Sequence, residues 1–369
     1  MKTILFLIPT LGGGGAEKVL VNLVNHLNRK KYHIEIITLF RDNKNLKFLR
    51  DDIRVTSVFR KQFKGNRIVF KFFSPRFLYN RIIKNRYDIV VSYLEGPGER
   101  IVSGCPYPDS KLVNWIHVER HTKAIAAVSY RNENEFEKCL GKFNCSVAVS
   151  ETVKADTEKL VSTNQNIKTL YNTLDVKNIK TSSLQPSGIN FDNHTINIFS
   201  VGRLTPQKGF DRLIKVCAQL INDGFKLNLY LLGSGELQND LQQIARELEI
   251  DKFVHLLGFH ANPYKYLKHA DLFVCSSRSE GFSTAVSEAL ILGIPVVSTN
   301  CSGATELLGE NNEFGIVINN SCDGVYEGVK KMISNPATLQ YYREAAKKRG
   351  EKFSTMATVR AVENMFDSL

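Results

Sequence analysis

The chain alternates between short, continuously apolar runs and stretches with helical spacing, and this alternation restricts its fold more than any other feature. Residues 3–8 and 34–39 have the length of single strands, and residues 16–27 between them have the pattern of a helix. Strands that are apolar throughout are typical of parallel sheets covered by helices on both faces. The sequence therefore predicts an α/β fold built from doubly wound parallel sheets.

Two sets of such strands occur, and a polar stretch separates them. The first domain is expected over residues 1–180 and the second over 196–353; residues 181–195 (TSSLQPSGINFDNHT) have the composition of a linker. We therefore expect two Rossmann-like domains facing a central cleft, with ligand sites beyond the carboxyl ends of the strands. The further strand candidates are 89–92, 112–116 and 146–149 in the first set, and 197–201, 227–232, 254–257, 272–275, 295–298 and 315–318 in the second.

Two carboxylates, Glu280 and Glu288, stand on either side of an expected helix start. Ser283 and Thr284 are suitable N-cap residues for a helix over 285–292. The unpaired amides and positive dipole end of a helix start bind anions such as phosphate. Carboxylates suit sugar hydroxyls instead, so this element predicts a site for a nucleotide-sugar.

Basic and glycine-rich turns follow other strands of the second set. Arg203 and Lys208 come directly after the strand at 197–201, and such side chains can hold a diphosphate leaving group. Gly233 and Phe259 follow the next two strands, and the glycine turn before Phe259 could let the backbone read a flat base. A tight turn into a helix explains these two turns equally well.

In the first domain, the candidate residues are Gly14 and Gly15, within four successive glycines after the first strand, and His117, which ends the strand at 112–116. The glycine spacing matches neither a dinucleotide fingerprint nor a P-loop, and the second strand ends at Arg41 without the acid that binds an NAD ribose. His117 suits acid–base chemistry, although a lone histidine at a strand end is more often structural.

Several signals are absent. No Asp-x-Asp occurs in the chain, so we expect no divalent metal and no other cofactor, and positive side chains must stabilise the leaving diphosphate. The seven cysteines are scattered and form no CxxC pair, which indicates a reducing cytoplasm. No apolar run approaches the roughly 20 residues of a membrane span.

The net charge of +12 is concentrated near the amino terminus. Residues 29–86 hold 17 Lys or Arg and four acids, a net charge of +13, and aromatic residues that include seven between Phe59 and Tyr79. Such a segment can dock on an anionic membrane, and Lys61, Lys64, Arg67 and Lys71 are expected to contribute. A solvated basic face above core phenylalanines is the alternative; nucleic acid is not expected, because no nucleic-acid-binding motif accompanies the charge.

Taken together, the motifs resemble glycosyltransferase family 4, a retaining group with the two-domain GT-B fold. The resemblance rests on GGGGAEKVL, His117, YNTLD at 171–175, VGRLTPQKGFDRLI, LLGSGE and EGFSTAVSE. It implies that residues 354–369 form a helix crossing back to the first domain. It also implies that the first domain binds the acceptor and the second the nucleotide-sugar donor.

The resemblance implies roles for individual residues. Arg203 and Lys208 would hold the donor diphosphate, Glu280 the sugar hydroxyls and Glu288 the ribose hydroxyls. The backbone amides of Phe282, Ser283 and Thr284 would approach the sugar and phosphate, Gly14 and Gly15 the donor phosphate or the acceptor, and His117 would lie near the donor sugar.

The resemblance also implies a reaction: metal-independent transfer of a sugar, with retention, from a nucleotide-sugar such as a UDP-sugar. The expected acceptor is a polyprenyl-diphosphate-linked saccharide of capsule, exopolysaccharide or O-antigen synthesis, at the cytoplasmic face of the cell membrane. The alternatives are a nucleotide-sugar epimerase, a nicotinamide-dependent oxidoreductase on a related scaffold, or a non-catalytic nucleotide-sugar-binding protein.

Overall fold

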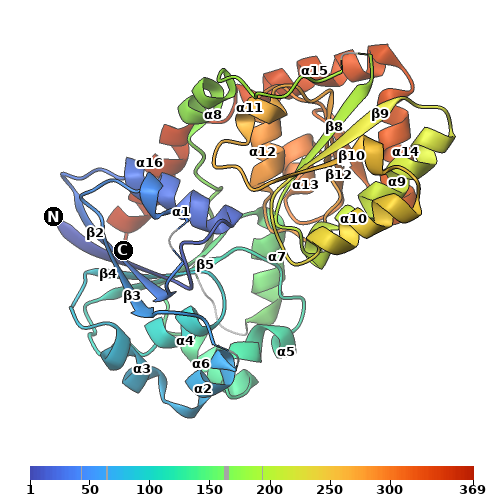
Figure 1. Ribbon diagram of the computed structural model, residues 1–369. Helices are drawn as coiled ribbons and strands as arrows, with labels where there is room; N and C mark the ends of the chain where they lie inside the picture. Colours follow the sequence, from blue (N-terminus) through green and yellow to red (C-terminus); the bar gives the residue numbers. More distant parts are fainter. Residues whose placement is uncertain (43, 64, 162–165, 193) are drawn as a thin grey trace. The chain divides into compact units, whose positions relative to one another are not determined.

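A computed structural model describes residues 1–42, 44–63, 65–161, 166–192 and 194–369. The chain divides into two compact units, one comprising Met1–Thr173 with Thr355–Leu369 and the other Leu174–Ser354. Residues 181–195 lie in the second unit and begin with the last turn of helix α8. Each unit contains one parallel sheet covered by helices (Figure 1).

The first unit has seven strands in the order β3-β2-β1-β4-β5-β6-β7. Apolar side chains from both faces of the central strands are buried, as expected of a parallel sheet between helices. The strands are β1 (Lys2–Ile8), β2 (Tyr32–Phe40), β3 (Arg54–Phe59), β4 (Ile89–Tyr93), β5 (Lys111–Ile116), β6 (Cys145–Ala148) and β7 (Ile167–Thr169). The helices are α1 (Gly15–His26), η1 (Leu46–Phe48), α2 (Asn66–Phe72), α3 (Pro75–Ile82), α4 (Pro97–Val102), α5 (Lys123–Ala126), η2 (Ala127–Ser129), α6 (Glu133–Leu140), α7 (Glu151–Leu160) and α16 (Thr355–Asp367).

The carboxyl-terminal helix α16 packs on the first sheet and beside α1 (Figure 1). The Phe366 ring lies edge-on to Phe6 and Tyr32, with ring centroids 6.3 and 6.0 Å apart. The Tyr32 hydroxyl donates to Asp367 Oδ1 at 2.6 Å, and Lys2 Nζ donates to the Phe366 carbonyl at 2.7 Å. Aromatic packing and these polar contacts therefore hold the last segment of the chain on the first unit.

The second unit has six strands in the order β10-β9-β8-β11-β12-β13. Its core joins apolar side chains of the sheet to helices α9, α10 and α14. The strands are β8 (Ile196–Val201), β9 (Leu227–Leu232), β10 (Val254–Gly258), β11 (Leu272–Cys275), β12 (Val296–Thr299) and β13 (Ile316–Ile318). The helices are α8 (Val176–Ser183), η3 (Pro206–Lys208), α9 (Phe210–Asn222), α10 (Gln238–Glu247), η4 (Asp251–Phe253), α11 (Tyr264–Leu267), α12 (Thr284–Ile291), α13 (Ala304–Leu308), α14 (Cys322–Ile333) and α15 (Pro336–Gly350).

The predicted α/β class with two doubly wound sheets is confirmed, and two strands were missed. β3 has the sequence RVTSVF, in which polar residues alternate with apolar ones, because one side of this edge strand is exposed. β7 has only three residues and lies at the other edge of the same sheet. Neither strand has the continuous apolar run that identified the central strands.

Candidate active site

In the second unit, the loops that follow two neighbouring strands, β8 and β11, run in opposite directions. β8 and β11 are neighbours, and the chain continues from β8 towards β9 on one side and from β11 towards β12 on the other. Ligands of doubly wound sheets bind at such a switch point, where the two loops diverge. The loop after β8 carries Arg203 and Lys208, and the loop after β11 carries Glu280.

Lys208 and Glu280 meet at this switch point. Lys208 Nζ lies 2.5 Å from Glu280 Oε1, and the Ser277 hydroxyl donates to the same oxygen at 2.6 Å. The side chains of Lys208 and Glu280 are only 20% and 12% exposed. An ammonium has three donors, so Lys208 can bind Glu280 and a phosphate oxygen together.

The charge on Lys208 is stabilised by its surroundings. Burial opposes the charged form, but the adjacent Glu280 carboxylate outweighs it and raises the pKa of Lys208. Arg203 is exposed on the same loop, close enough that its charge acts on Lys208 in the opposite direction. The loop thus presents two cations.

A buried arginine, Arg212 on α9, fixes the loop that carries Ser277. Its Nε donates to the Ser276 carbonyl and its Nη2 to the Ser277 carbonyl, both at 2.7 Å. Sequence reasoning missed Arg212 and Ser277. The available signals were an arginine among apolar residues of a helix and serines directly after a buried strand.

Helix α12 begins beside this loop and positions Glu288. Ser283 is its N-cap and accepts from the Val286 amide, as the sequence predicted for this position. Glu288 lies on the second turn, only 3% exposed, and accepts from the Tyr264 hydroxyl at 2.9 Å. Burial and then the Glu288 carboxylate raise the pKa of Tyr264 well above its usual range. Tyr264 therefore remains a neutral donor that orients the carboxylate.

Phe282 and Gly233, two further predicted site residues, lie in loops that follow β11 and β9. The Phe282 side chain is buried. Gly233 has φ of +148°, and a Cβ there would lie 1.8 Å from the Gly202 carbonyl oxygen. This glycine is thus required for two post-strand loops to pack together. Phe259, which follows β10, is 48% exposed.

The first unit has a second switch point between β1 and β4. The glycine loop follows β1, with Gly14 as the N-cap of α1 and Gly15 as its first residue. The Glu17 carboxylate lies against this loop: a Cβ on Gly14 would come within 2.2 Å of Glu17 Oε2. An acid at this helix start disfavours a phosphate and favours a hydroxyl group as the ligand of the loop.

His117 follows β5, the next strand along the same sheet edge. Its ring is buried and lies 4.9 Å from the ring of Tyr93, which ends β4. Glu95, in the loop after β4, accepts from the backbone amides of His117 and Val118. Among the described residues, no side chain or backbone group bonds to His117 Nε2. Burial lowers the pKa of His117 to about 3, so the imidazole is neutral near pH 7.

Comparison with known proteins decides the family. Residues 13–178 match Glycosyltransferase Family 4, and residues 184–349 match Glycosyl transferases group 1. The chain belongs to glycosyltransferase family 4.

Relatives of this family 4 glycosyltransferase extend along its whole length. N-acetylgalactosamine-N,N'-diacetylbacillosaminyl-diphospho-undecaprenol 4-alpha-N-acetylgalactosaminyltransferase of Campylobacter jejuni is 28% identical over 98% of each chain. An uncharacterized glycosyltransferase of Haemophilus influenzae is 26% identical, over 91% of this chain and 92% of the relative. Anabaena HepE, solved in complex with UDP and glucose, superposes with a TM-score of 0.79 at 18% identity over the whole of both chains. This structural similarity confirms the GT-B fold.

One group of potential metal ligands occurs in the described part of this glycosyltransferase. Glu119, His121 and Asp156 bring ligand atoms within 4.8 Å of one another. Asp156 already accepts from the backbone amides of Arg120 at 2.7 Å and His121 at 3.2 Å. These contacts give Asp156 a structural role in ordering the turn after His117.

The lowered pKa of His117 predicts that the protein loses stability as the pH falls. The unfolded chain takes up a proton at His117 near pH 6.5, whereas the folded chain does so only near pH 3. The contribution of His117 to the free energy of unfolding is therefore fully present above pH 6.5 and is lost as the pH falls toward 3. We expect His117→Gln to reduce the acid slope of the unfolding free energy by up to about 1.4 kcal/mol per pH unit.

Urea unfolding between pH 7.5 and 4.5 measures this slope. His194→Gln is the control, because His194 is exposed in the second unit. Equal slopes for the wild type and His117→Gln would contradict the assigned burial of a neutral imidazole.

Proposed function

We propose that this glycosyltransferase moves a sugar from a UDP-sugar, with retention of configuration, to a hydroxyl of a polyprenyl-diphosphate-linked saccharide. The observation that supports the donor half is the ion pair of Lys208 with Glu280, whose carboxylate also accepts from the Ser277 hydroxyl, at the switch point of the second unit. One cation and one carboxylate, each held by the other, suit the adjoining phosphate and hydroxyl groups of a sugar diphosphate.

The second unit supplies the groups that a nucleotide-sugar requires. Arg203 and Lys208 bind the diphosphate, and the first amides of α12 add donors that have no acceptor within the helix. Glu280 accepts from the hydroxyls of the donor sugar. Glu288, held by Tyr264, accepts from the ribose hydroxyls, and the exposed Phe259 contacts the base.

In the proposed reaction, the bond from the sugar C1 to the diphosphate breaks and a bond from the acceptor oxygen to C1 forms on the same face. The acceptor proton passes to the departing phosphate oxygen. Arg203 and Lys208 stabilise the charge that develops on the diphosphate, and they replace a metal in this role. Glu280 is bound to Lys208 and serves as a positioning carboxylate rather than as a nucleophile.

The first unit is proposed to bind the acceptor. Its glycine loop carries the Glu17 carboxylate, which suits an acceptor hydroxyl. The neutral His117 offers a hydrogen bond without charge to the donor sugar. The Campylobacter relative, whose name describes transfer to a diphospho-undecaprenol saccharide, supports an acceptor of this class. A Staphylococcus aureus relative named for capsular polysaccharide biosynthesis supports a role in polysaccharide synthesis.

The test of the donor class is calorimetric titration of the purified chain, without added metal, with UDP, GDP, ADP and NADPH in turn. We expect UDP to bind most tightly. Transfer of labelled sugar from UDP-sugars to a lipid extract then tests the acceptor. Binding of NADPH alone, or of none of the four, would overturn the proposal.

We propose that the enzyme acts at the cytoplasmic face of an anionic membrane. In the described part of the chain, no helix combines the length and apolar character that a bilayer crossing requires. Helices α2 and α3 of the basic segment nevertheless expose apolar side chains: Ile68, Phe72 and Phe77 are 62%, 77% and 52% exposed. Lys71 and Arg76 accompany them, whereas Lys64 and the side chain of Arg67 lie outside the described residues.

Two arginines hold the end of α2 in place. The buried Arg100 donates to the carbonyls of Phe70 and Phe73, both at 2.7 Å. Arg131 donates to the carbonyls of Lys71 at 2.7 Å and Phe72 at 2.9 Å. The backbone is therefore fixed while the aromatic side chains point to solvent, which suits insertion among lipid headgroups.

Vesicle binding tests this surface. We expect Phe72→Ser/Phe77→Ser to reduce cosedimentation with phosphatidylglycerol vesicles at least about tenfold, since each ring contributes roughly 1.5–3 kcal/mol on burial. The control Leu184→Ser/Leu248→Ser removes exposed apolar side chains of the second unit and should bind as the wild type does. Full retention by the first variant would refute the assignment.

A further inference from the structure

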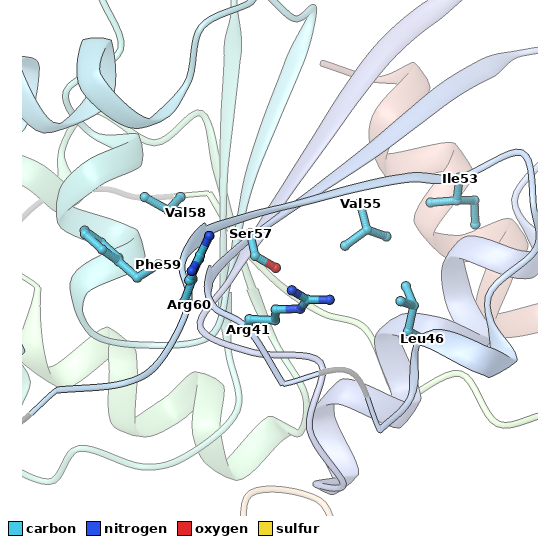
Figure 2. Close-up of a pocket in the computed structure, with 8 residues that line it drawn as sticks. All are labelled: Arg41, Leu46, Ile53, Val55, Ser57, Val58, Phe59 and Arg60. Carbon is cyan, nitrogen blue, oxygen red and sulfur yellow. The ribbon is translucent and has the colours of Figure 1, made fainter.

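An open hollow lies on the edge strand β3 of the first unit, apart from the glycine loop and His117. Its volume is about 610 Å³, within the range of small-molecule sites. Val55 and Ser57 of β3 and Ile53, which precedes the strand, contribute its floor, and Leu46 of η1 borders it (Figure 2).

Two arginines give the hollow its charge. Arg41 follows β2 and Arg60 follows β3, so both come from the carboxyl ends of neighbouring strands. Both side chains line the hollow, as does Ser57 (Figure 2). No carboxylate is among the described residues that line it. The hollow therefore combines an apolar floor with two forked, permanently charged donors.

Arg41 and Leu46 line the hollow, and their sequence neighbours Asp42 and Asn45 reach the glycine loop. The Asn45 amide donates to the Leu11 carbonyl at 3.0 Å, and its side chain donates to the Gly12 carbonyl. Asp42 also turns toward that loop, since a Cβ on Gly12 would lie 2.7 Å from Asp42 Oδ2. Residues 41–42 and 45–46 thus border both the hollow and the loop proposed to contact the acceptor hydroxyl.

We propose that this hollow binds the diphosphate end of an isoprenoid diphosphate, the lipid anchor of the acceptor. Arg41 and Arg60 bind the phosphate oxygens in forked geometry, and Ile53, Val55 and Leu46 pack against the first isoprene units. The inference rests on the proposed function, because it assigns a subsite to the proposed acceptor. A free nucleotide has no apolar chain for this floor, and the second unit holds the donor.

The probe is farnesyl diphosphate, titrated calorimetrically into the full chain, with inorganic diphosphate, dihexanoyl phosphatidylglycerol and UDP in parallel. The variant is Arg41→Gln/Arg60→Gln. The matched control, Arg54→Gln/Lys84→Gln, removes the same charge from exposed positions of the same basic segment outside the hollow.

We expect the variant to bind farnesyl diphosphate at least about tenfold more weakly, because two charge-assisted contacts are lost. The control should bind it as the wild type does, and inorganic diphosphate should bind the wild type more weakly than farnesyl diphosphate. Equal affinities of variant and wild type would overturn the proposal. Tighter binding of phosphatidylglycerol than of farnesyl diphosphate, abolished by the same variant, would also overturn it, by making the hollow a membrane-lipid site.

Titration with UDP distinguishes a failure of the proposed isoprenoid diphosphate site from a failure of the proposed glycosyltransferase function. UDP should bind the hollow variant and the wild type equally, since its site lies in the second unit. Absence of UDP binding to the wild type would count against the proposed function and leave the hollow to be judged by farnesyl diphosphate alone.

Discussion

Lys208→Ala is expected to lower kcat about 100-fold with any UDP-sugar donor that the enzyme accepts. Removal of one positioned charged donor from a transition state costs roughly 3 kcal/mol. The structure places this ammonium 2.5 Å from Glu280, at the switch point of the second sheet. The loss should fall mainly on kcat, because charge on the diphosphate develops as the sugar departs.

The same substitution should also destabilise the second unit moderately. Glu280 would keep the Ser277 hydroxyl at 2.6 Å but lose its cation, and a poorly satisfied buried acceptor costs about 1–3 kcal/mol. Thermal unfolding therefore has to accompany the kinetics, so that activity is compared at a temperature where both proteins are folded.

Lys330→Ala is the matched control. Lys330 pairs with Asp223 at 3.0 Å in the same unit, but their side chains are 41% and 31% exposed. Exposed pairs contribute little to stability, and this pair lies away from the switch point. An unchanged kcat in Lys208→Ala, or an equal loss in both variants, would remove Lys208 from the proposed mechanism.

The sequence predicted those parts of the fold and site that depend on local patterns. The start of α12 was predictable because Ser283 is a strong N-cap and Glu280 and Glu288 flank it at fixed spacing. The central strands were predictable because both of their faces are buried. The edge strand β3 was not, and with it the hollow between Arg41 and Arg60 was missed.

Contacts between residues far apart in the sequence could not be predicted from such local patterns. Nothing in the spacing of Arg212 shows that it holds the backbone after β11, because that contact depends on how α9 packs against the sheet. The burial of His117 likewise follows from its neighbours Tyr93 and Glu95, which belong to another strand and loop. Local sequence thus identified candidate groups, and packing decided their protonation and orientation.

Arg120→Met is expected to cause the largest loss of stability, about 3–5 kcal/mol, as is typical when one partner of a buried ion pair is removed. Arg120 is 5% exposed and binds Glu99, which is fully buried and also accepts from the Tyr130 hydroxyl at 3.1 Å. Burial opposes the charge of Arg120, but Glu99 and then Glu95 outweigh it and raise its pKa. The variant would leave the fully buried Glu99 and the partly buried Glu95 without their cation.

Urea unfolding of the variant at two pH values tests the cause of this loss. Burial raises the pKa of Glu95, so protonation in the folded state should relieve the variant as the pH falls, and the loss should be smaller at pH 5.5 than at pH 8. Arg120→Met/Glu99→Gln should recover part of the stability. Arg86→Met, whose pair with Asp109 is 59% and 77% exposed, should cost less than about 1 kcal/mol.

Arg120→Met also tests whether the buried ion pair affects catalysis. Glu95 interacts with Arg120 and accepts from the His117 amide, so loss of the cation should displace the turn that carries His117. We expect the kcat of folded Arg120→Met to fall and that of Arg86→Met to stay unchanged. A destabilised variant with full kcat would show that the ion pair supports the fold alone, and a loss of stability below about 1 kcal/mol would contradict its buried character.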